Sequence, residues 1–204
     1  MKIDPDGLDY KGLHDLMMSC ISPRPIALIS TISVNGIFNV APYSCVSPVS
    51  NQPPLVGVSI GTYRNGQKKD TLINVCSSRE FVINVVHEGM AEAMNKASRD
   101  WPIDIDEFNE TGLTAGKADF VKSPLVEESP INMECRLMQI LDVGDETRHT
   151  DFVIGKVLCV HVKDEFLKGG KILIHKLNAI GRMGGEYYCR AANIFEMKRP
   201  YMLR

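Results

Sequence analysis

Short runs of β-branched and other apolar residues, separated by turn-forming residues, recur along most of the chain. Runs of this length and composition predict strands. They lie at residues 25–33, 38–46, 55–60, 81–86, 131–143, 152–162 and 172–175. Asn35-Gly36 favours a tight hairpin between the first two runs. Pro53-Pro54 can precede the third strand but cannot lie inside its ladder.

The run at 131–143 alternates between apolar and polar residues. The apolar positions share one face: Ile131, Met133, Cys135, Leu137 and Leu141. The polar positions share the other: Glu134, Arg136 and Asp142. Because successive side chains of a strand point to opposite faces, this pattern predicts one buried and one solvent-facing side. In the next run, Gly155 favours a β-bulge.

Helical spacing is limited to three short stretches, at 71–78, 88–98 and 105–111, the last closed by Gly112. Neither a linker nor a repeat divides the chain. We therefore expect residues 1–204 to form a single domain, mainly β with peripheral helices. Many strands without a long helix after each favour a barrel over a doubly wound sheet.

Composition narrows the classes of function. Of the 204 residues 44% are hydrophobic, and 23 basic against 25 acidic side chains give a formal charge of −2. Nucleic-acid binding usually needs a basic excess, and the aromatic content of 7% is low for stacking bases. We therefore expect no nucleic-acid partner. Since neither a signal-peptide pattern nor an apolar run of about 18 residues is present, we also expect a cytoplasmic protein with no membrane partner.

Several short motifs lack the context that their chemistry needs. The six cysteines and five histidines show no CxxC, HxxxH or HxH spacing, so no metal site is expected. The sequence GVSIG at 57–61 matches the GxSxG elbow of hydrolases, but a loop follows it where the elbow needs a helix. A hydrolase remains a minor alternative. No GxGxxG is present, which disfavours a Rossmann dinucleotide site.

Two segments suit an anionic or planar ligand. In Pro23-Arg24-Pro25 the prolines hold the arginine in extended backbone before a strand. That arginine is either a fixed cation for an anionic ligand or a solvated residue at the strand entry. Residues 39–48, NVAPYSCVSP, are rich in small hydroxyls and proline. They form either a backbone that lies against a flat ligand or an edge strand blunted by proline.

A third segment, RNGQKKDTL at 64–72, carries basic residues into a predicted helix start. The free amides and positive dipole of a helix N-terminus, together with lysine and threonine side chains, suit a phosphate. An ordinary capped helix after a solvated basic loop would give the same pattern.

Together these segments resemble the flavin reductase-like family over roughly residues 20–190. The motifs that carry the resemblance are Pro23-Arg24-Pro25, Ser30-Thr31, Gly36, NVAPYS at 39–44, Pro53-Pro54, Lys69-Asp70-Thr71 with Asn74, EFVIN at 80–84, Glu134-Cys135, Val143-Gly144-Asp145, IGKV at 154–157 and GRMGGEYY at 181–188. Family members often have a histidine directly after the Gly-Asp of the second-half turn. Here the nearest is His149, and its role stays open.

The resemblance implies an FMN-binding split β-barrel of Greek-key type, and a homodimer with FMN at or near the subunit interface. It assigns the phosphate to Lys69, Asp70 and Thr71, helped by Arg64 or Arg24. The ring edge is assigned to the second segment, through Asn39, Ala41, Pro42, Tyr43, Ser44 and Ser47. Ser30 and Thr31 would hold the ribityl chain or the ring. No catalytic side chain is expected, because hydride transfer between stacked rings needs proximity alone.

Three functions fit this resemblance. The first is an NAD(P)H-dependent flavin reductase, with NADH or NADPH as electron donor. The second is a flavoredoxin-like FMN electron carrier that accepts electrons from a protein partner. The third is a flavin-binding protein with no turnover of its own.

Overall fold

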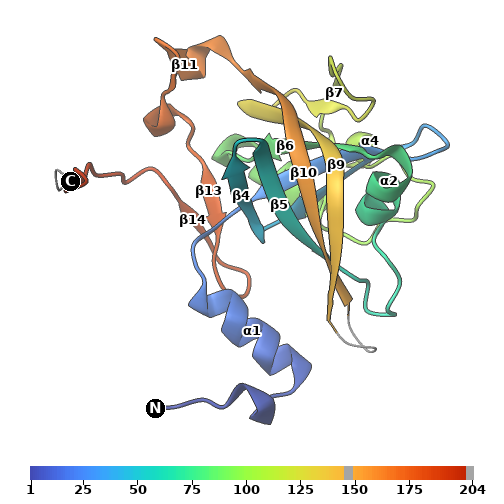
Figure 1. Ribbon diagram of the computed structural model, residues 1–204, viewed down its shortest axis with the longest axis vertical. Helices are drawn as coiled ribbons and strands as arrows, with labels where there is room; N and C mark the ends of the chain where they lie inside the picture. Colours follow the sequence, from blue (N-terminus) through green and yellow to red (C-terminus); the bar gives the residue numbers. More distant parts are fainter. Residues whose placement is uncertain (145–148, 201–204) are drawn as a thin grey trace.

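The structure is a computed structural model that describes residues 1–144 and 149–200. Its main feature is a seven-stranded antiparallel sheet in the order β3-β2-β6-β9-β10-β5-β4 (Figure 1). Its strands are β2 (Ala27–Ile32), β3 (Phe38–Tyr43), β4 (Val46–Asn51), β5 (Pro54–Gly61), β6 (Glu80–Val85), β9 (Ile131–Gly144) and β10 (His149–Val162). As described, this sheet is open, with β3 and β4 at its edges. The expectation of a mainly β fold is confirmed.

Smaller elements surround the sheet. Short strands form three further pairings: β1 (Arg24–Pro25) with β13 (Ile180–Arg182) and β14 (Tyr188–Arg190), β7 (Ala115–Gly116) with β8 (Leu125–Val126), and β11 (Leu167–Lys168) with β12 (Lys171–Ile172). The α-helices are α1 (Tyr10–Cys20), α2 (Asp70–Ser78), α3 (Ala91–Lys96) and α4 (Glu107–Thr111). The 3₁₀ turns are η1 (Pro5–Gly7), η2 (Glu88–Met90), η3 (Asp164–Phe166) and η4 (Ile174–Lys176). Within the described ranges, the helices are too short or too polar to span a bilayer.

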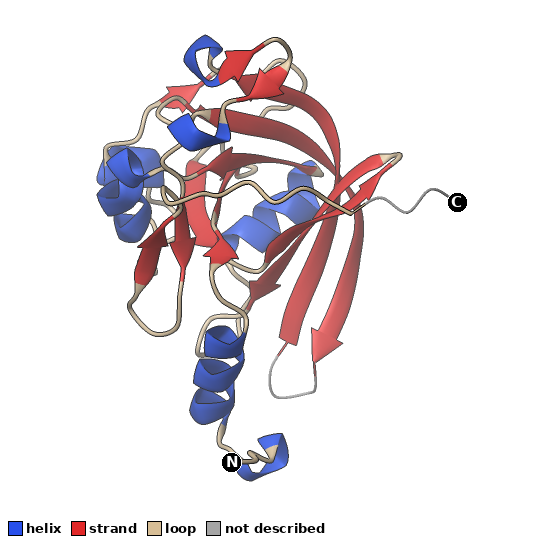
Figure 2. Cartoon of the chain, turned by 90° about the vertical axis from the view of Figure 1, so that its left-hand side faces the viewer, coloured by secondary structure: helices blue, strands red, loops and turns tan. Residues whose placement is uncertain are grey.

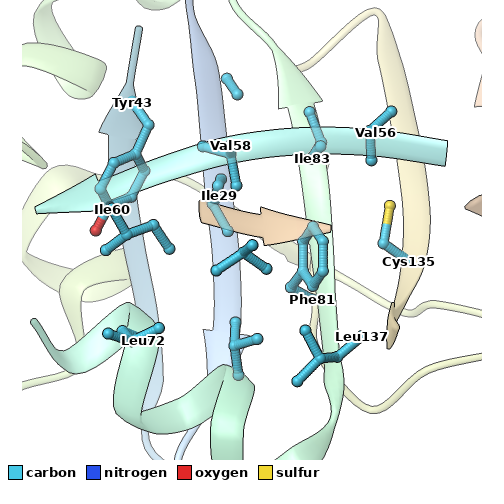
Figure 3. Packing of buried hydrophobic residues seen from close by; sticks show 13 residues of the cluster. Ile29, Tyr43, Val56, Val58, Ile60, Leu72, Phe81, Ile83, Cys135 and Leu137 are labelled. Carbon is cyan, nitrogen blue, oxygen red and sulfur yellow. The ribbon is translucent and has the colours of Figure 1, made fainter. Parts of the chain in front are cut away.

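Apolar clusters cover both faces of the sheet. On one face the strands and α2 bury Ile29, Tyr43, Val58, Leu72, Phe81 and Leu137 (Figure 3). On the other face α3, α4 and β8 bury Leu28, Val40, Met94, Phe108 and Val126. Since neighbouring residues of β2 enter opposite clusters, Ala27, Leu28 and Ile29 form a continuous apolar run instead of alternating with polar residues. Each such side chain contributes roughly 1.5–3 kcal/mol through burial.

The bulge predicted at Gly155 is confirmed. The pairing between β9 and β10 shifts register between Ile154 and Gly155. A Cβ added at Gly155 would come within 2.4 Å of Cζ of Phe81, so the phenyl ring fills the space over this glycine. The missing side chain therefore lets the Phe81 ring pack against the long β9–β10 hairpin.

Two strand predictions need correction. The run at 38–46 is not one strand: β3 ends at Tyr43, and the edge strand β4 begins at Val46. No separate strand was predicted at β4, although an edge strand blunted by proline was one interpretation of residues 39–48; an edge strand tolerates Pro48. The strand predicted at 172–175 is also wrong. There β12 ends at Ile172 and η4 begins at Ile174; both isoleucines are exposed, so no core face extends the strand.

The helix predictions were right in place and wrong in detail. The stretch at 88–98 is divided into η2 and α3. The helix expected at 105–111 begins at Glu107, because the Asp106 carboxylate accepts hydrogen bonds from the amides of the next turn. It ends where expected, at Gly112 with φ of 77°. Helix α1 was not predicted, and none of its residues is buried.

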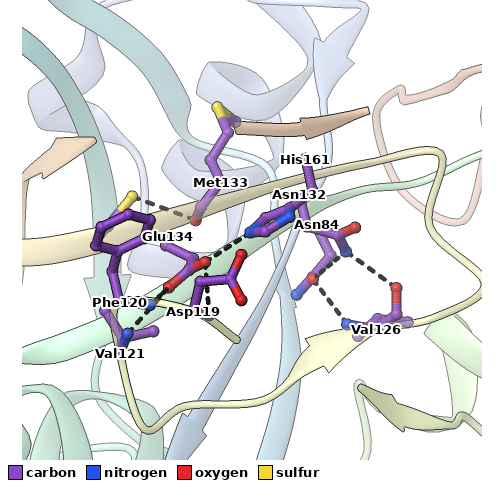
Figure 4. A network of polar contacts seen from close by, with 10 residues as sticks. Asn84, Asp119, Phe120, Val121, Val126, Asn132, Met133, Glu134 and His161 are labelled. Carbon is purple, nitrogen blue, oxygen red and sulfur yellow. Dashed lines mark hydrogen bonds and ion pairs between the residues drawn. The ribbon is translucent and has the colours of Figure 1, made fainter. Parts of the chain in front are cut away.

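The solvent-facing position predicted for Glu134 is wrong. Its side chain has no exposed surface, because residues 119–121 fold over this part of β9. The amides of Asp119, Phe120 and Val121 donate to its carboxylate at 3.0, 2.6 and 2.9 Å (Figure 4). Burial alone would raise the pKa of Glu134, but His161 and these amides together hold it below the ordinary value. An alternation pattern cannot reveal a loop that covers the outer face.

Candidate functional site

A cleft of about 740 Å³ opens at the edge of the sheet. Its walls come from α1, β3, the end of β5, the start of α2, residues 94–100 and the β13–β14 hairpin. This volume lies within the range of small-molecule sites, roughly 300–1,000 Å³. The cleft therefore joins parts of the chain that lie far apart in the sequence.

Most of the residues assigned to a ligand from the sequence lie in this cleft. They are Arg24, Asn39, Ala41, Pro42, Tyr43, Ser44, Arg64, Lys69, Asp70 and Thr71. Three others lie elsewhere. Ser30 is fully buried and donates to the carbonyl of Pro124, Thr31 is buried beneath Asn39, and Ser47 is exposed on β4. The sequence also missed part of the lining, including Arg99, Glu107 and Arg182.

The N-terminus of α2 faces the cleft with cations beside it. Lys69 is the N-cap residue and makes no side-chain hydrogen bond to the first turn. Its Nζ lies 3.9 Å from Oδ1 of Asp100 and 5.2 Å from the centre of the Tyr63 ring. Arg64 is exposed on the same side. An uncapped helix start with two nearby cations favours an anion.

Buried hydrogen bonds fix the start of α2 against the sheet. Thr71 Oγ1 and Thr31 Oγ1 both donate to Oδ1 of Asn39, at 2.9 and 3.1 Å. Nδ2 of Asn74 in turn donates to Oγ1 of Thr31 at 3.0 Å. Since the hydroxyl proton of Thr71 is already engaged, what Thr71 offers to a ligand is its first-turn backbone amide.

Tyr43 has a buried hydroxyl without a partner. Only 9% of its side chain is exposed, and its Oη makes no hydrogen bond to any described residue. Burial raises the pKa of this phenol, against the opposing effect of the nearby Thr71 side chain, so it keeps its proton. A buried donor left unpaired costs about 1–3 kcal/mol. A polar ligand group that reaches it would remove this cost.

Glu107 on α4 places a buried carboxyl group in the cleft wall. One carboxylate oxygen accepts from the backbone amide of Val40 at 2.8 Å. Burial raises the pKa of Glu107 from 4.5 to about 7, against the hydrogen bonds from Val40 and Asn39, and the negative charge of Asp70 adds to the rise. This residue holds a proton over part of the neutral range.

Arg24 is neither solvated nor free. Its guanidinium donates to the carbonyls of Met18, Ile21 and Met183 and to Oγ of Ser44. It thereby ties α1, the β13–β14 hairpin and the end of β3 together. Within the described ranges no carboxylate lies within ion-pair distance of it. The cleft wall therefore contains a buried cation whose charge is not neutralised.

Two other residues considered from the sequence lie outside this arrangement. His149 begins β10, and its Nδ1 lies 3.1 Å from Oδ1 of Asp142. Residues 145–148, which precede it, are outside the described part of the chain. Ser59 of the GxSxG sequence pairs with Phe152 inside β5 and is followed by a strand residue. The helix that a nucleophile elbow needs does not follow it.

Comparisons with known proteins agree with this architecture. The chain matches the flavin reductase-like domain family over residues 18–180. Its fold is similar to nitrilotriacetate monooxygenase component B from Bacillus cereus, with 30% identity, a TM-score of 0.92 and coverage of 97% of this chain and 98% of that one. It is also similar to 2-nitrobenzoate 2-nitroreductase NbaA from Pseudomonas fluorescens, with 27% identity, a TM-score of 0.89 and coverage of 100% of this chain and 98% of that one. Flavoredoxin of Desulfovibrio vulgaris (Miyazaki F) shares the fold alone, with 20% identity, a TM-score of 0.75 and coverage of 87% of this chain and 91% of that one.

Proposed function

The chain belongs to the flavin reductase-like family, and on that premise we propose that it binds FMN in the cleft and acts as an NAD(P)H-dependent flavin reductase. The observation that carries the proposal is the meeting of one phosphate-type helix start, at Lys69 and Thr71, with an edge strand, β3, in the same cleft. A single such start suits the one phosphate of FMN better than the two of FAD.

The free edge of β3 suits the ring of a flavin. Val40 sends its backbone amide outward to Glu107, and alternate residues of a strand turn their backbone groups to the same side. Pro42 therefore offers its carbonyl outward and, being proline, leaves no N–H unpaired there. Ala41 and Ser44 lie beside it in the cleft. This backbone would bind the polar edge of a planar ring.

Two further features fit a flat ligand at this place. A Cβ added at Gly61, which lines the cleft, would meet no heavy atom within 4 Å. Tyr43 lines the cleft, and its buried Oη would become a donor to a ligand group that reaches it. The residues present therefore fit the phosphate, the ring and the space that FMN needs.

Bound FMN would supply the redox chemistry, accepting electrons from a nicotinamide and passing them on. The chain's own residues have other tasks. Lys69, Arg64 and the first turn of α2 would bind the phosphate, and β3 would orient the ring. Thr31 and Asn39 would act indirectly, by holding Thr71 and hence the helix start in place. Ser30 and Ser47 have no direct part in this arrangement.

A flavoredoxin-like electron carrier is the second candidate. It is favoured by the fold shared with flavoredoxin and by the lack of a dinucleotide-binding motif in the sequence. In that role the same cleft would hold FMN, but the electrons would come from a protein partner. For either function we also propose that the chain forms a Greek-key split barrel, assembles as a homodimer and is cytoplasmic.

Anaerobic reduction separates these functions. The purified protein loaded with FMN is mixed with NADH or with NADPH, and the flavin absorbance is followed. Rapid bleaching by either nucleotide is expected for a reductase. An FMN-loaded protein that neither nucleotide bleaches, but that a reduced redox protein does, would make it a carrier. A protein that neither donor reduces would be a flavin binder without turnover.

A further inference from the structure

Three side chains with metal-binding atoms meet outside the cleft. They are Glu134 of β9 and Cys159 and His161 of β10, with one ligand atom of each within 4.8 Å of the others. Cys159 pairs directly opposite Glu134, and His161 follows two residues later on the same face of β10. A bulge between Val157 and Cys159 sets this register. The cluster therefore depends on the strand pairing, which no CxxC or HxH spacing in the sequence could reveal.

The carboxylate of Glu134 is held as metal-ligating carboxylates usually are. It is fully buried, and three backbone amides from residues 119–121 donate to it. Its Oε1 lies 2.6 Å from Nε2 of His161 (Figure 4). Such outer hydrogen bonds orient a ligand and are typical of metal sites. Both oxygens are thus fixed in position before any ion arrives.

The charge around the cluster also favours a cation. Within the described ranges, His161 is the ion-pair partner of Glu134, with no lysine or arginine beside it. Asp119 joins this network only through its backbone amide, and its exposed carboxylate adds negative charge nearby (Figure 4). A dication here would be neutralised by one carboxylate and one thiolate.

We propose that Glu134, Cys159 and His161 form a zinc-binding site. The Oε1 of Glu134, the thiolate of Cys159 and Nε2 of His161 would be the ligands, with water in the fourth position. This set of oxygen, sulfur and nitrogen donors suits zinc. On binding, the Cys159 thiol releases its proton to solvent, and the imidazole binds neutral, with its proton on Nδ1.

The geometry needs only small side-chain movements. With zinc bonds of about 2.0–2.3 Å, neighbouring ligand atoms of a tetrahedral site lie about 3.3–3.5 Å apart. The Oε1–Nε2 distance of 2.6 Å must therefore widen, and the larger separations in the cluster must close. His161 can adjust because 27% of its side chain is exposed, and this partial exposure also gives the ion a route of entry.

Metal content and a cobalt spectrum test the site. The protein is dialysed against buffered zinc and then against metal-free buffer, and zinc is counted by mass spectrometry. One zinc ion per chain is expected. Replacement by cobalt should give a sulfur-to-cobalt charge-transfer band in the near ultraviolet, together with the visible absorption of a tetrahedral centre.

Matched variants separate this site from stray surface thiols. Cys159→Ala should abolish the charge-transfer band and weaken zinc binding by more than about 100-fold, since losing even an outer partner costs 10–100-fold. His161→Gln keeps an N–H donor for Glu134 and should lose the metal without unfolding, which circular dichroism checks. Cys189→Ala removes another part-exposed thiol and should change nothing.

Either of two results would overturn the proposal. Wild-type protein that retains no stoichiometric zinc or cobalt has no such site. Zinc and cobalt signals that persist in folded Cys159→Ala, or that disappear equally in Cys189→Ala, place the metal on other thiols.

Discussion

Glu107 makes stability depend on pH in a direction opposite to that of most carboxylates. Its pKa rises from 4.5 to about 7 on burial, so the folded protein keeps a proton that the unfolded chain releases. The free energy of unfolding therefore falls as the pH rises from 4.5 to 7. At about 1.4 kcal/mol for each pKa unit, the effect of this residue is about 3 kcal/mol.

Urea unfolding of the wild type and of Glu107→Gln, measured across this range, checks the prediction. The glutamine keeps an acceptor for the Val40 amide but cannot titrate, so wild type should lose stability relative to it with rising pH. Glu110→Gln is the control, since Glu110 is exposed on the same helix. Parallel curves for wild type and Glu107→Gln would contradict the buried, protonated carboxyl.

The sequence indicated which segments meet in the cleft, but it did not indicate the hydrogen-bond partners of their individual side chains. NVAPYS and KDT were selected as ligand-binding segments, and Asn39, Tyr43, Lys69 and Thr71 do meet in one cleft; that they bind a ligand stays a prediction. The partners of their polar atoms were not visible. The hydroxyl of Thr71 donates to Asn39, thirty-two residues away in the sequence. The fold brings these two residues together and buries Thr71 away from solvent. Such long-range partners depend on the completed fold.

The N-terminus of α2 is the element on which the phosphate assignment rests. Lys69→Ala should weaken FMN binding about tenfold or more, since a charge-assisted hydrogen bond is worth about 1.5–3 kcal/mol. Riboflavin, which lacks the phosphate, should bind equally well to both proteins. Lys68→Ala is a matched control, because Lys68 is the exposed neighbour that faces Asp151. Flavin fluorescence titration measures the affinity of each protein for FMN and for riboflavin.

An equal loss for riboflavin and FMN would show that Lys69 acts through the fold and not through the phosphate. Unchanged FMN affinity would move the phosphate to another cation of the cleft, such as the buried Arg24.

Elements with a buried face were predictable, and those without one were not. The long strands β9 and β10 were located within a few residues, because part of each, including Leu137 and Val153, packs into the core, although Leu141, expected on the buried face, is exposed. Helix α1 has no buried residue, and β4 is an edge strand with proline, so neither has a strong periodic signal. The open sheet order follows from pairings between distant strands, which no local pattern contains.

At the scale of the whole molecule, one chain leaves apolar parts uncovered. Helix α1 buries no residue in the single chain and stands away from the sheet (Figure 2). An isolated helix of its eleven residues would be marginal in water. Beyond β14, Phe195 and Met197 are largely exposed. A second copy of the chain would cover these segments, in line with the homodimer that we propose.

If α1 and the cleft it lines are completed by a second subunit, dimerisation and FMN binding must favour each other by the same factor. Diluting the FMN-loaded protein through its dimer dissociation range should therefore release flavin. Sedimentation and flavin fluorescence, recorded on the same samples, follow the two processes. A monomer that holds FMN tightly at every dilution would rule out a shared site.

One measurement tests most directly whether the cleft is the flavin site. It compares the dissociation constant for FMN of the Gly61→Leu variant with that of the wild type. Gly61 lines the cleft, and neither it nor Gly7 of η1 has a heavy atom within 4 Å of an added Cβ. A leucine at Gly61 should fill ligand space and cost about 1–3 kcal/mol of binding, roughly a 5- to 150-fold loss, whereas Gly7→Leu should bind FMN as the wild type does. Folded Gly61→Leu protein that binds FMN with wild-type affinity would place the flavin elsewhere and contradict the account.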